Sequence, residues 1–280
     1  MTEAGAPATG FEIGRVLRRS LVVTRERWPT LLTLTFGLQW GAPRVLGLVV
    51  HSSYRSGSRD VAGFVLVVAL TLANSLIFYI SRAALMQCAL QPTRESSPIA
   101  AVKSLVAVLP TLAPIWLAQE YATVWRLWSR WTDLGATLIR SAGANAILAL
   151  VEGPILIEAA ITLAAAAAFG VFTPVVIVER RNLVAALGRA GALLRGARWK
   201  FVAIFLLFGV AEIAVSAPQL ALQIGRLGPH TIAMQITAWI TSAASDGVSA
   251  FWAVVIAVAY EELRNVREGA PHNRLAEVFA

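Results

Sequence analysis

The stretch that decides the fold is VVIVERRNLVAALGRAGALLRGARWKF, residues 175–201. An apolar segment ends at Val178, and a charged cluster follows at residues 179–181. Apolar residues then recur at helical spacing over residues 183–194, before a new apolar segment begins at Phe201. This periodicity is typical of a short amphipathic helix. The stretch therefore predicts a basic elbow that joins two membrane helices.

The composition of the whole chain favours a membrane protein over a soluble one. Of its 280 residues, 57% are hydrophobic and 14% are charged, whereas soluble domains carry about 25% charged residues. The net charge is +8, but the basic residues flank apolar segments instead of forming one soluble patch. That distribution excludes a nucleic-acid-binding protein. Because Cys88 is the single cysteine, an intramolecular disulfide is also excluded.

Six segments approach the ~20 apolar residues that one bilayer crossing needs. We therefore predict an all-α, polytopic membrane protein with six transmembrane helices. The predicted spans cover residues 28–43, 61–80, 106–124, 154–178, 201–224 and 232–260. The predicted organisation is a disordered tail at residues 1–10, one transmembrane domain at residues 11–265 and a cytoplasmic tail at residues 266–280.

Basic amphipathic segments precede three pairs of predicted spans. They begin near residues 11, 97 and 183, at a spacing of 86 residues. This spacing predicts three copies of a unit that consists of one elbow helix and one helical hairpin. A chance periodicity is the open alternative. The identities that support the repeat lie 171 residues apart: Arg18, Arg27 and Trp28 match Arg189, Arg198 and Trp199.

The basic residues also predict the orientation of the chain. With six spans, 17 of the 24 Lys and Arg residues fall on the side of the two termini. Because positive residues concentrate on the cytoplasmic side of membrane proteins, both termini are expected in the cytoplasm. The first ten residues, MTEAGAPATG, lack the apolar core of a cleavable signal peptide.

Three motifs carry a resemblance to a known family. They are PVVIVER at residues 174–180, ALGRAGALLRG at residues 186–196, and YEELR at residues 260–264 with REG shortly after it. Together they resemble bacterial inner-membrane proteins related to the membrane domain of glycerophosphoryl diester phosphodiesterase. Those proteins usually have Ser where Ala190 stands and Lys where Arg267 stands. The resemblance implies six helices and an inner-membrane location, and it implies no particular activity.

The sequence offers no convergent set of catalytic groups. The histidines His51, His230 and His272 are scattered, and none lies at metal-ligand spacing from a second ligand. A GxSxG motif and a glycine-rich phosphate loop that opens a helix are both missing from the sequence. We therefore expect a protein that is not an enzyme, with no metal and no cofactor.

Polar residues within the predicted spans form one group of candidate site residues. They are Asn74, Glu158, Glu212 and Asp246. An ionised group inside a bilayer costs several kcal/mol unless it is paired, hydrated or protonated. These residues are therefore consistent with a path for a proton, an ion or a polar solute. Hydrogen bonding between helices is the alternative interpretation. Arg82 is expected to anchor the end of its span at the interface.

Basic residues of the elbows form the second group. They are Arg15, Arg18, Arg19, Arg189, Arg195 and Arg198. Each could contribute on the order of 1 kcal/mol to the binding of anionic phospholipid headgroups, although a role in topology alone is the alternative. The leading functional hypothesis is support of membrane or lipid homeostasis, and a transporter is the competing one. The expected partners are membrane phospholipids; a second copy of the chain or another membrane protein stays open.

Overall fold

The computed structural model is helical throughout the part of the chain that it describes, and that part contains no strand. It describes residues 10–41, 61–90, 98–114, 116, 117, 120, 164, 168, 170–224 and 232–268. The helices are α1 (Ile13–Glu26), α2 (Trp28–Leu34), the π-helix η1 (Thr35–Gly41), α4 (Val61–Leu90), α5 (Pro98–Leu105), α10 (Phe172–Glu179), α11 (Leu183–Leu194), α12 (Arg198–Ile224) and α13 (Ile232–Glu268).

Three helices in the described part are long and apolar enough to cross a membrane. These segments are Val68–Leu90 of α4, Arg198–Gln219 of α12 and Ile232–Glu268 of α13, and they indicate a membrane protein. They correspond to the second, fifth and sixth predicted spans. The outward face of α12 is apolar, as a lipid-facing surface requires. Large apolar side chains exposed on it include Leu206, Leu207, Val210 and Ile213. The other three predicted spans extend outside the described residues, so the total of six spans stays a prediction.

Two of these helices extend beyond the predicted limits. The second predicted span ends at residue 80, whereas α4 continues to Leu90. The sixth ends at residue 260, whereas α13 continues to Glu268 and has 37 residues. At a rise of 1.5 Å per residue, α13 is ~55 Å long, and the hydrocarbon core of a bilayer is ~30 Å thick. The charged C-terminal part of α13 therefore extends past a single crossing.

The fourth predicted span does not run unbroken to residue 178. A turn at Gly170 and Val171 separates α10 from the residues before it. Pro174 lies in the first turn of α10, and a proline ring clashes with the carbonyl group four residues earlier, which here belongs to Gly170. A continuous helix through this point is therefore disfavoured, and a short new helix begins at Phe172 instead.

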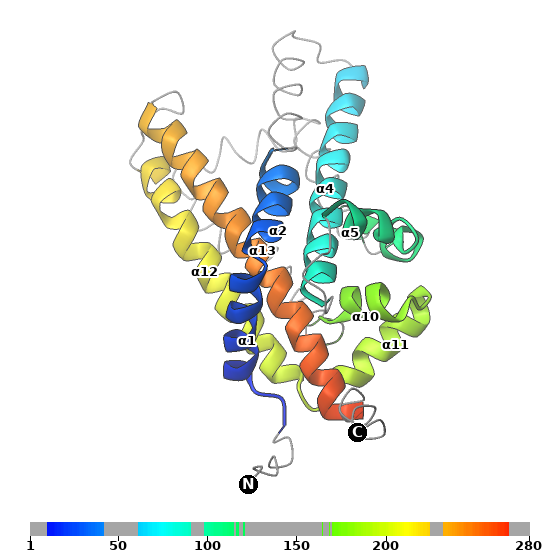
Figure 1. Ribbon diagram of the computed structural model, residues 1–280. Coiled ribbons are helices and arrows are strands. Elements are labelled where there is room, and N and C mark those ends of the chain that lie inside the picture. The colour runs from blue at the N-terminus through cyan, green and yellow to red at the C-terminus, as the bar shows by residue number, and fades with distance from the viewer. Residues whose placement is uncertain are drawn as a thin grey trace.

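Buried side chains gather around the C-terminal half of α13. Residues 252–260 are all buried, and α13 contacts α4, α12, α1, α11 and α10. Figure 1 shows these helices arranged around the lower half of α13. Small residues let α4 approach closely: Ala84 on α4 and Ala253 and Ala257 on α13 are completely buried. The core therefore lies around the C-terminal half of α13, where α1, α10 and α11 also pack; we call this the elbow end of the molecule.

The turn after α5 and the turn after α11 have the same backbone hydrogen bonds. In each turn, two amides donate to carbonyl groups three residues earlier, and an amide of the next helix donates four residues back. The donors are Val106, Val108 and Leu112 after α5, and Arg195, Ala197 and Phe201 after α11, at an offset of 89 residues. Buried residues recur at the same offset: Ala101, Leu105, Val108 and Leu112 match Ala190, Leu194, Ala197 and Phe201.

The starts of the elbow helices are evenly spaced as well. The helices α1, α5 and α11 begin at residues 13, 98 and 183, which are 85 residues apart. The offset between α5 and α11 is 85 residues at their starts and 89 residues in the turns that follow them. It grows because α11 has 12 residues and α5 has 8, a difference of about one helical turn. The same turn thus follows α5 and α11. The threefold unit stays a prediction, because the hairpins that complete it extend outside the described residues.

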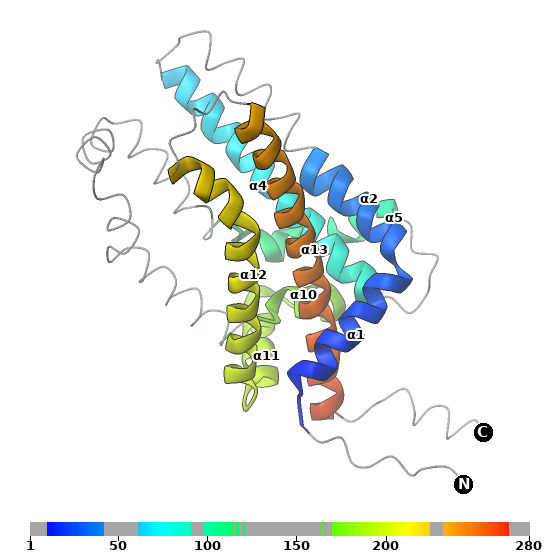
Figure 2. The same ribbon diagram turned by 90° about the vertical axis from the view of Figure 1, so that its left-hand side faces the viewer.

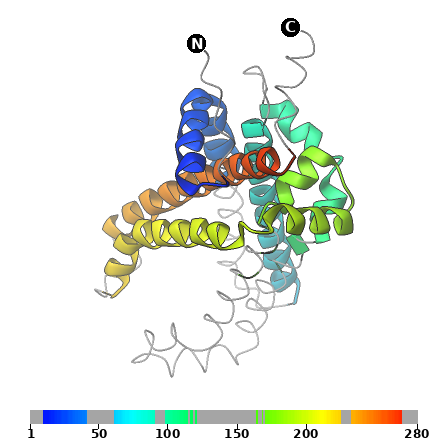
Figure 3. The same cartoon turned by 90° about the horizontal axis from the view of Figure 1, so that it is seen from below.

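The helix α1 is docked on the bundle along one face. Val16 and Ser20 of this face are buried. At its start, the Phe11 ring stacks on Phe201 of α12 with 6.4 Å between the ring centroids, and Lys200 Nζ donates to the Phe11 carbonyl oxygen at 2.6 Å. The helix itself packs against α13, as Figures 2 and 3 show.

Candidate functional site at the elbow

The loop between α10 and α11 is built from four polar residues. The last residue of α10 is Glu179, and Arg180 after it adopts a left-handed conformation with φ of 48°. Asn182 then caps α11, because its Oδ1 accepts a hydrogen bond from the Ala185 amide at 3.0 Å. Asparagine is among the preferred residues at this position. The chain therefore reverses within three residues, and Glu179 is held between α11 and α13.

Glu179 is the centre of a polar network. Its side chain is 12% exposed, and its carboxylate accepts three hydrogen bonds. Tyr260 Oη of α13 donates at 3.2 Å, Arg189 Nε of α11 at 3.1 Å and Arg181 Nε of the loop at 2.7 Å. All three are charge-assisted, because a carboxylate accepts them, and in two of them the donor is charged as well; such bonds are stronger than neutral hydrogen bonds. A single carboxylate thus joins α10, α11 and α13.

Two further ion pairs extend this network along the end of α13. Arg189 also contacts the carboxylate of Glu268, and Arg264 Nε lies 3.0 Å from Glu268 Oε2. We call the whole set the elbow network; it consists of Glu179, Arg181, Arg189, Tyr260, Arg264 and Glu268. Arg189 bridges both carboxylates with its side chain 23% exposed. By bridging Glu179 and Glu268, Arg189 holds α11 against α13.

Two arginines of α1 form a clamp on the same end of α13. Arg15 lies 2.6 Å from Glu262, and Arg19 lies 2.5 Å from Glu261. The negative charge of the Glu262 carboxylate is the main cause of the raised pKa of Arg15. Glu262 is buried, so Arg15 supplies the counter-charge that a buried carboxylate needs. The basic face of α1 is therefore partly directed toward the protein.

The structure divides the six predicted headgroup-binding arginines into two sets. Arg15, Arg19 and Arg189 have carboxylate partners within the chain. The other three are exposed and form no ion pair within the described part of the chain, and we call them the outer cations. They are Arg18 on α1, Arg195 after α11 and Arg198 at the start of α12.

Exposed apolar side chains lie close to the outer cations in the sequence. Trp199 is 84% exposed next to Arg198, and Leu21 is 60% exposed one helical turn after Arg18. Val184 of α11 is 79% exposed. Exposing large apolar side chains to water is unfavourable. Tryptophan beside arginine is typical of a membrane–water interface, which would cover such side chains. Arg18 and Arg198 thus each have an exposed apolar side chain close by in the sequence.

The predicted intramembrane residues are only partly brought together. Glu212 of α12 accepts a hydrogen bond from Ser245 Oγ of α13 at 2.8 Å. Asp246 is half-buried beside Ser245 in α13. Glu158 lies outside the described residues. Two candidate membrane helices, α12 and α13, are thus joined by the polar contact between Glu212 and Ser245.

Arg82 lies farther from the end of its helix than the sequence predicted. The helix α4 continues past it to Leu90, so Arg82 lies within the helix and not at its end. Its guanidinium group lies over the Phe78 ring, 5.2 Å from the centroid, which is the geometry of a cation–π contact. Its Nε atom is buried and has no hydrogen-bond partner among the described residues. The contact with Phe78 supplies part of the stabilisation that a half-buried arginine within an apolar helix requires.

Asn74 lies next to a second, smaller set of polar contacts. Its Oδ1 is buried and has no hydrogen-bond partner in the described part of the structure. The neighbouring Ser75 Oγ donates to the Glu120 carboxylate and accepts a hydrogen bond from Trp116 Nε1 at 3.0 Å. These contacts join α4 to the helical residues that follow α5. They support the alternative interpretation, in which polar side chains hold helices together.

The chemistry of the elbow is electrostatic. No group of three potential metal ligands occurs among the residues that the structure describes. Searches for a matching family model, a similar curated protein and a similar solved structure found none. The resemblance noted in the sequence therefore stays a resemblance, although its motif residues Glu179, Arg189 and Tyr260 meet in one network.

Sequence reasoning missed the carboxylates at the end of α13. Glu261, Glu262 and Glu268 all follow the predicted end of the last span at residue 260, and no role was predicted for them. A usable signal was present, since Arg15 and Arg19 are four residues apart and so lie on one helical face. Two adjacent carboxylates on another helix are suitable partners for such a pair.

Proposed function

We propose that this chain is a non-enzymatic, multi-pass membrane protein that binds anionic phospholipid headgroups at its elbow end and so supports membrane or lipid homeostasis. One observation carries the proposal: the outer cations Arg18, Arg195 and Arg198 are exposed beside exposed apolar residues. The other three arginines already have carboxylate partners in the chain. In the proposal, Arg15, Arg19 and Arg189 hold the elbow helices in position.

The physical basis of the proposal is a match of charge and depth. A phospholipid headgroup offers a phosphate to each cation, and the adjacent acyl region accepts Leu21 and Trp199. Each arginine near an anionic membrane surface contributes on the order of 1 kcal/mol. In this proposal the elbow end faces the cytoplasmic leaflet of a bacterial inner membrane, and both termini are cytoplasmic. The excess of basic residues on that side supports this orientation.

Neutralising the outer cations is expected to weaken the retention of anionic lipid. We expect Arg18→Gln, Arg195→Gln and Arg198→Gln together to lower the affinity for phosphatidylglycerol by about 100-fold at low salt, from three contributions of ~1 kcal/mol each. The measurement is native mass spectrometry of the full chain released from nanodiscs with defined lipid.

The matched control keeps the charge at the same three positions. We expect the triple Lys variant of Arg18, Arg195 and Arg198 to retain most of the bound lipid, because lysine also binds phosphate as a point charge. Equal lipid retention by the wild-type chain and the triple Gln variant would rule out the outer cations as the binding surface.

A transporter with a polar path is the second candidate function. The observation that favours it is the hydrogen bond between Glu212 of α12 and Ser245 of α13, which places a carboxyl group between two candidate membrane helices. Charged groups within a membrane are common in substrate and proton paths. In this alternative, Glu212 carries the proton or binds the solute, with Asp246 and Glu158 as further candidates on the path.

Flux measurements distinguish the two functions. A transporter predicts proton or solute flux in vesicles that contain the wild-type chain, and a loss of at least tenfold in Glu212→Gln, because a neutral amide cannot exchange a proton. Ser245→Ala is the milder control, since it removes one hydrogen bond and keeps the carboxylate. Wild-type vesicles without flux would eliminate the transporter and leave the lipid proposal intact.

A further inference from the structure

The outer face of α11 is apolar although the rest of the described chain leaves it exposed. Its inward face is buried against the bundle, and helical spacing places Val184, Gly188 and Ala192 on the opposite face. All three are exposed, and a Cβ atom added to Gly188 would meet nothing within 4 Å. Arg189 is the only polar residue within α11, and Arg195 follows directly after the helix. A helix that is apolar on nearly all sides is normally buried in a core or in a membrane.

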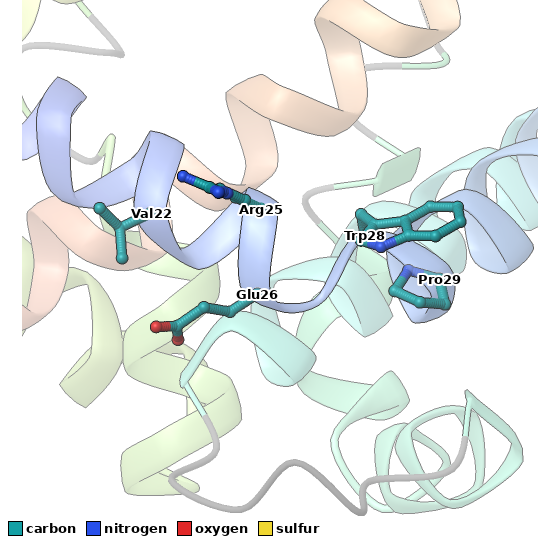
Figure 4. Close-up of a pocket in the computed structure, with 5 residues that line it drawn as sticks. All are labelled: Val22, Arg25, Glu26, Trp28 and Pro29. Atoms are coloured by element: carbon teal, nitrogen blue, oxygen red, sulfur yellow. The ribbon is translucent and has the colours of Figure 1, made fainter.

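The outer face of α1 has the same pattern with larger side chains. On the side opposite its buried residues, Leu21 and Val22 are exposed between Arg18 and Arg25, and this spacing places all four on one helical face. Glu26 is the single carboxylate of α1, and it is turned ~100° around the helix from Arg25. A hollow of about 470 Å³ at this end of α1 is lined only by exposed residues (Figure 4). The outer face is therefore uncovered, apolar in its middle and basic at both ends.

Contacts with α13 hold both helices at the same end of the molecule. The clamp of α1 pairs with Glu261 and Glu262, and Arg189 of α11 contacts Glu268. These carboxylates lie within ~10 Å of one another along the α13 axis, at a rise of 1.5 Å per residue. Figure 1 shows α11 running across the direction of α13, and Figures 2 and 3 show α1 crossing α13. Because α12 and α13 are candidate membrane helices, helices that run across them at one end have the orientation of interfacial helices.

We infer that α1 and α11 lie in one membrane leaflet as interfacial helices, with their outer faces against the acyl chains. Leu21, Val22 and Val184 then leave water for hydrocarbon, which is favourable. Arg18 and Arg195, at the ends of these faces, then meet headgroup phosphates. The inference rests on the proposed function for the placement of the elbow end at a membrane, and it extends the partner from the headgroups to the acyl chains.

Two observations favour lipid over a second copy of the chain as the cover of these faces. The outer face of α1 carries Arg18 and Arg25 at its two ends, so pairing two copies of it in either direction would bring positive charges together. The candidate membrane helix α12 begins at Arg198, three residues after Arg195. Its exposed Trp199 is typical of the membrane–water interface. The end of α11 is therefore at the level where the chain enters the membrane.

The test locates single spin labels on the full chain in vesicles of phosphatidylethanolamine and phosphatidylglycerol. Cys88, the single native cysteine, is first replaced by alanine, and labels are then attached at Val22→Cys and Gly188→Cys. The accessibility of each label to oxygen, which partitions into lipid, is compared with its accessibility to a water-soluble nickel chelate. We expect both labels to give an oxygen-to-nickel ratio close to that of a label at Ile213→Cys, on the exposed apolar face of α12.

The matched water-exposed control is Gly10→Cys. Gly10 and Gly188 are both exposed glycines at which an added Cβ atom would meet nothing within 4 Å, so a label fits equally well at both. Gly10 precedes α1 and ends the polar segment MTEAGAPATG. If the labels at Val22 and Gly188 gave the ratio of the Gly10 label, the inference would be overturned. Spin–spin broadening that disappears on dilution with unlabelled chain would also overturn it, because the cover would then be a second copy.

A second arm separates this inference from the proposed function. Changing Arg18, Arg195 and Arg198 to Gln is expected to lower phosphatidylglycerol retention and to leave the Gly188 label in lipid, because contact with acyl chains involves no charge. Unchanged retention with the label in lipid would contradict headgroup binding by the outer cations and support the inference. Lower retention with the label in water, in both the wild-type background and the triple variant, would support headgroup binding and overturn the inference.

Discussion

Replacing Glu179 with alanine is expected to destabilise the protein by about 3 kcal/mol, the scale for removing one partner of a buried ion pair. The Glu179 side chain is 12% exposed and accepts hydrogen bonds from Tyr260, Arg189 and Arg181. Its loss leaves the buried Tyr260 hydroxyl without its acceptor and Arg189 with Glu268 alone. The free energy of unfolding can be measured by titrating the detergent-solubilised chain with SDS.

The controls for Glu179 remove its partners one at a time. Arg181 has a side chain that is 48% exposed, so Arg181→Ala is expected to cost less than 1 kcal/mol. Tyr260→Phe removes a single hydrogen bond and is expected to cost about 1 kcal/mol. If Glu179→Ala cost no more than Arg181→Ala, the three elements would not depend on this carboxylate.

Local features of the elbow could be predicted from the sequence with good accuracy. The amphipathic pattern over residues 183–194 predicted a helix, and α11 covers Leu183–Leu194. Its apolar positions Ala190 and Leu194 are completely buried, as predicted for one face. The pattern is sufficient here because helix formation and burial of one face depend on neighbouring residues. The interruption before α10 was missed, although Gly170 and Pro174 are both in the sequence.

The division of the arginines could not be predicted in the same way. The sequence treated Arg15, Arg18 and Arg19 as equivalent, because all three belong to one basic segment. The structure separates them through carboxylates that are 242 and 247 residues away in the chain. No periodicity within α1 contains that information. It depends on α13 continuing past one bilayer crossing, so that Glu261 and Glu262 lie beside α1.

Phe201→Ala is expected to have the largest effect of any core substitution at the elbow end, about 3–5 kcal/mol of lost stability. Phe201 is completely buried in the first turn of α12. Its ring contacts Phe11 and Phe205, with centroid distances of 6.4 Å and 6.1 Å. The cavity left by alanine would lie between α1 and α12. We therefore expect a lower free energy of unfolding and faster proteolysis of α1 in the folded protein.

Trp199→Ala is the matched control for Phe201, since it removes an aromatic ring two residues away. Trp199 is 84% exposed, so its loss is expected to change the stability by less than about 0.5 kcal/mol. Proteolysis of α1 should also stay at the wild-type rate, because Trp199 is not part of the contact between Phe11 and Phe201. If the two variants were equally unstable, the buried ring would not be what holds α1 on α12. The outer cation Arg18 would then lack the rigid support that the lipid-binding surface requires.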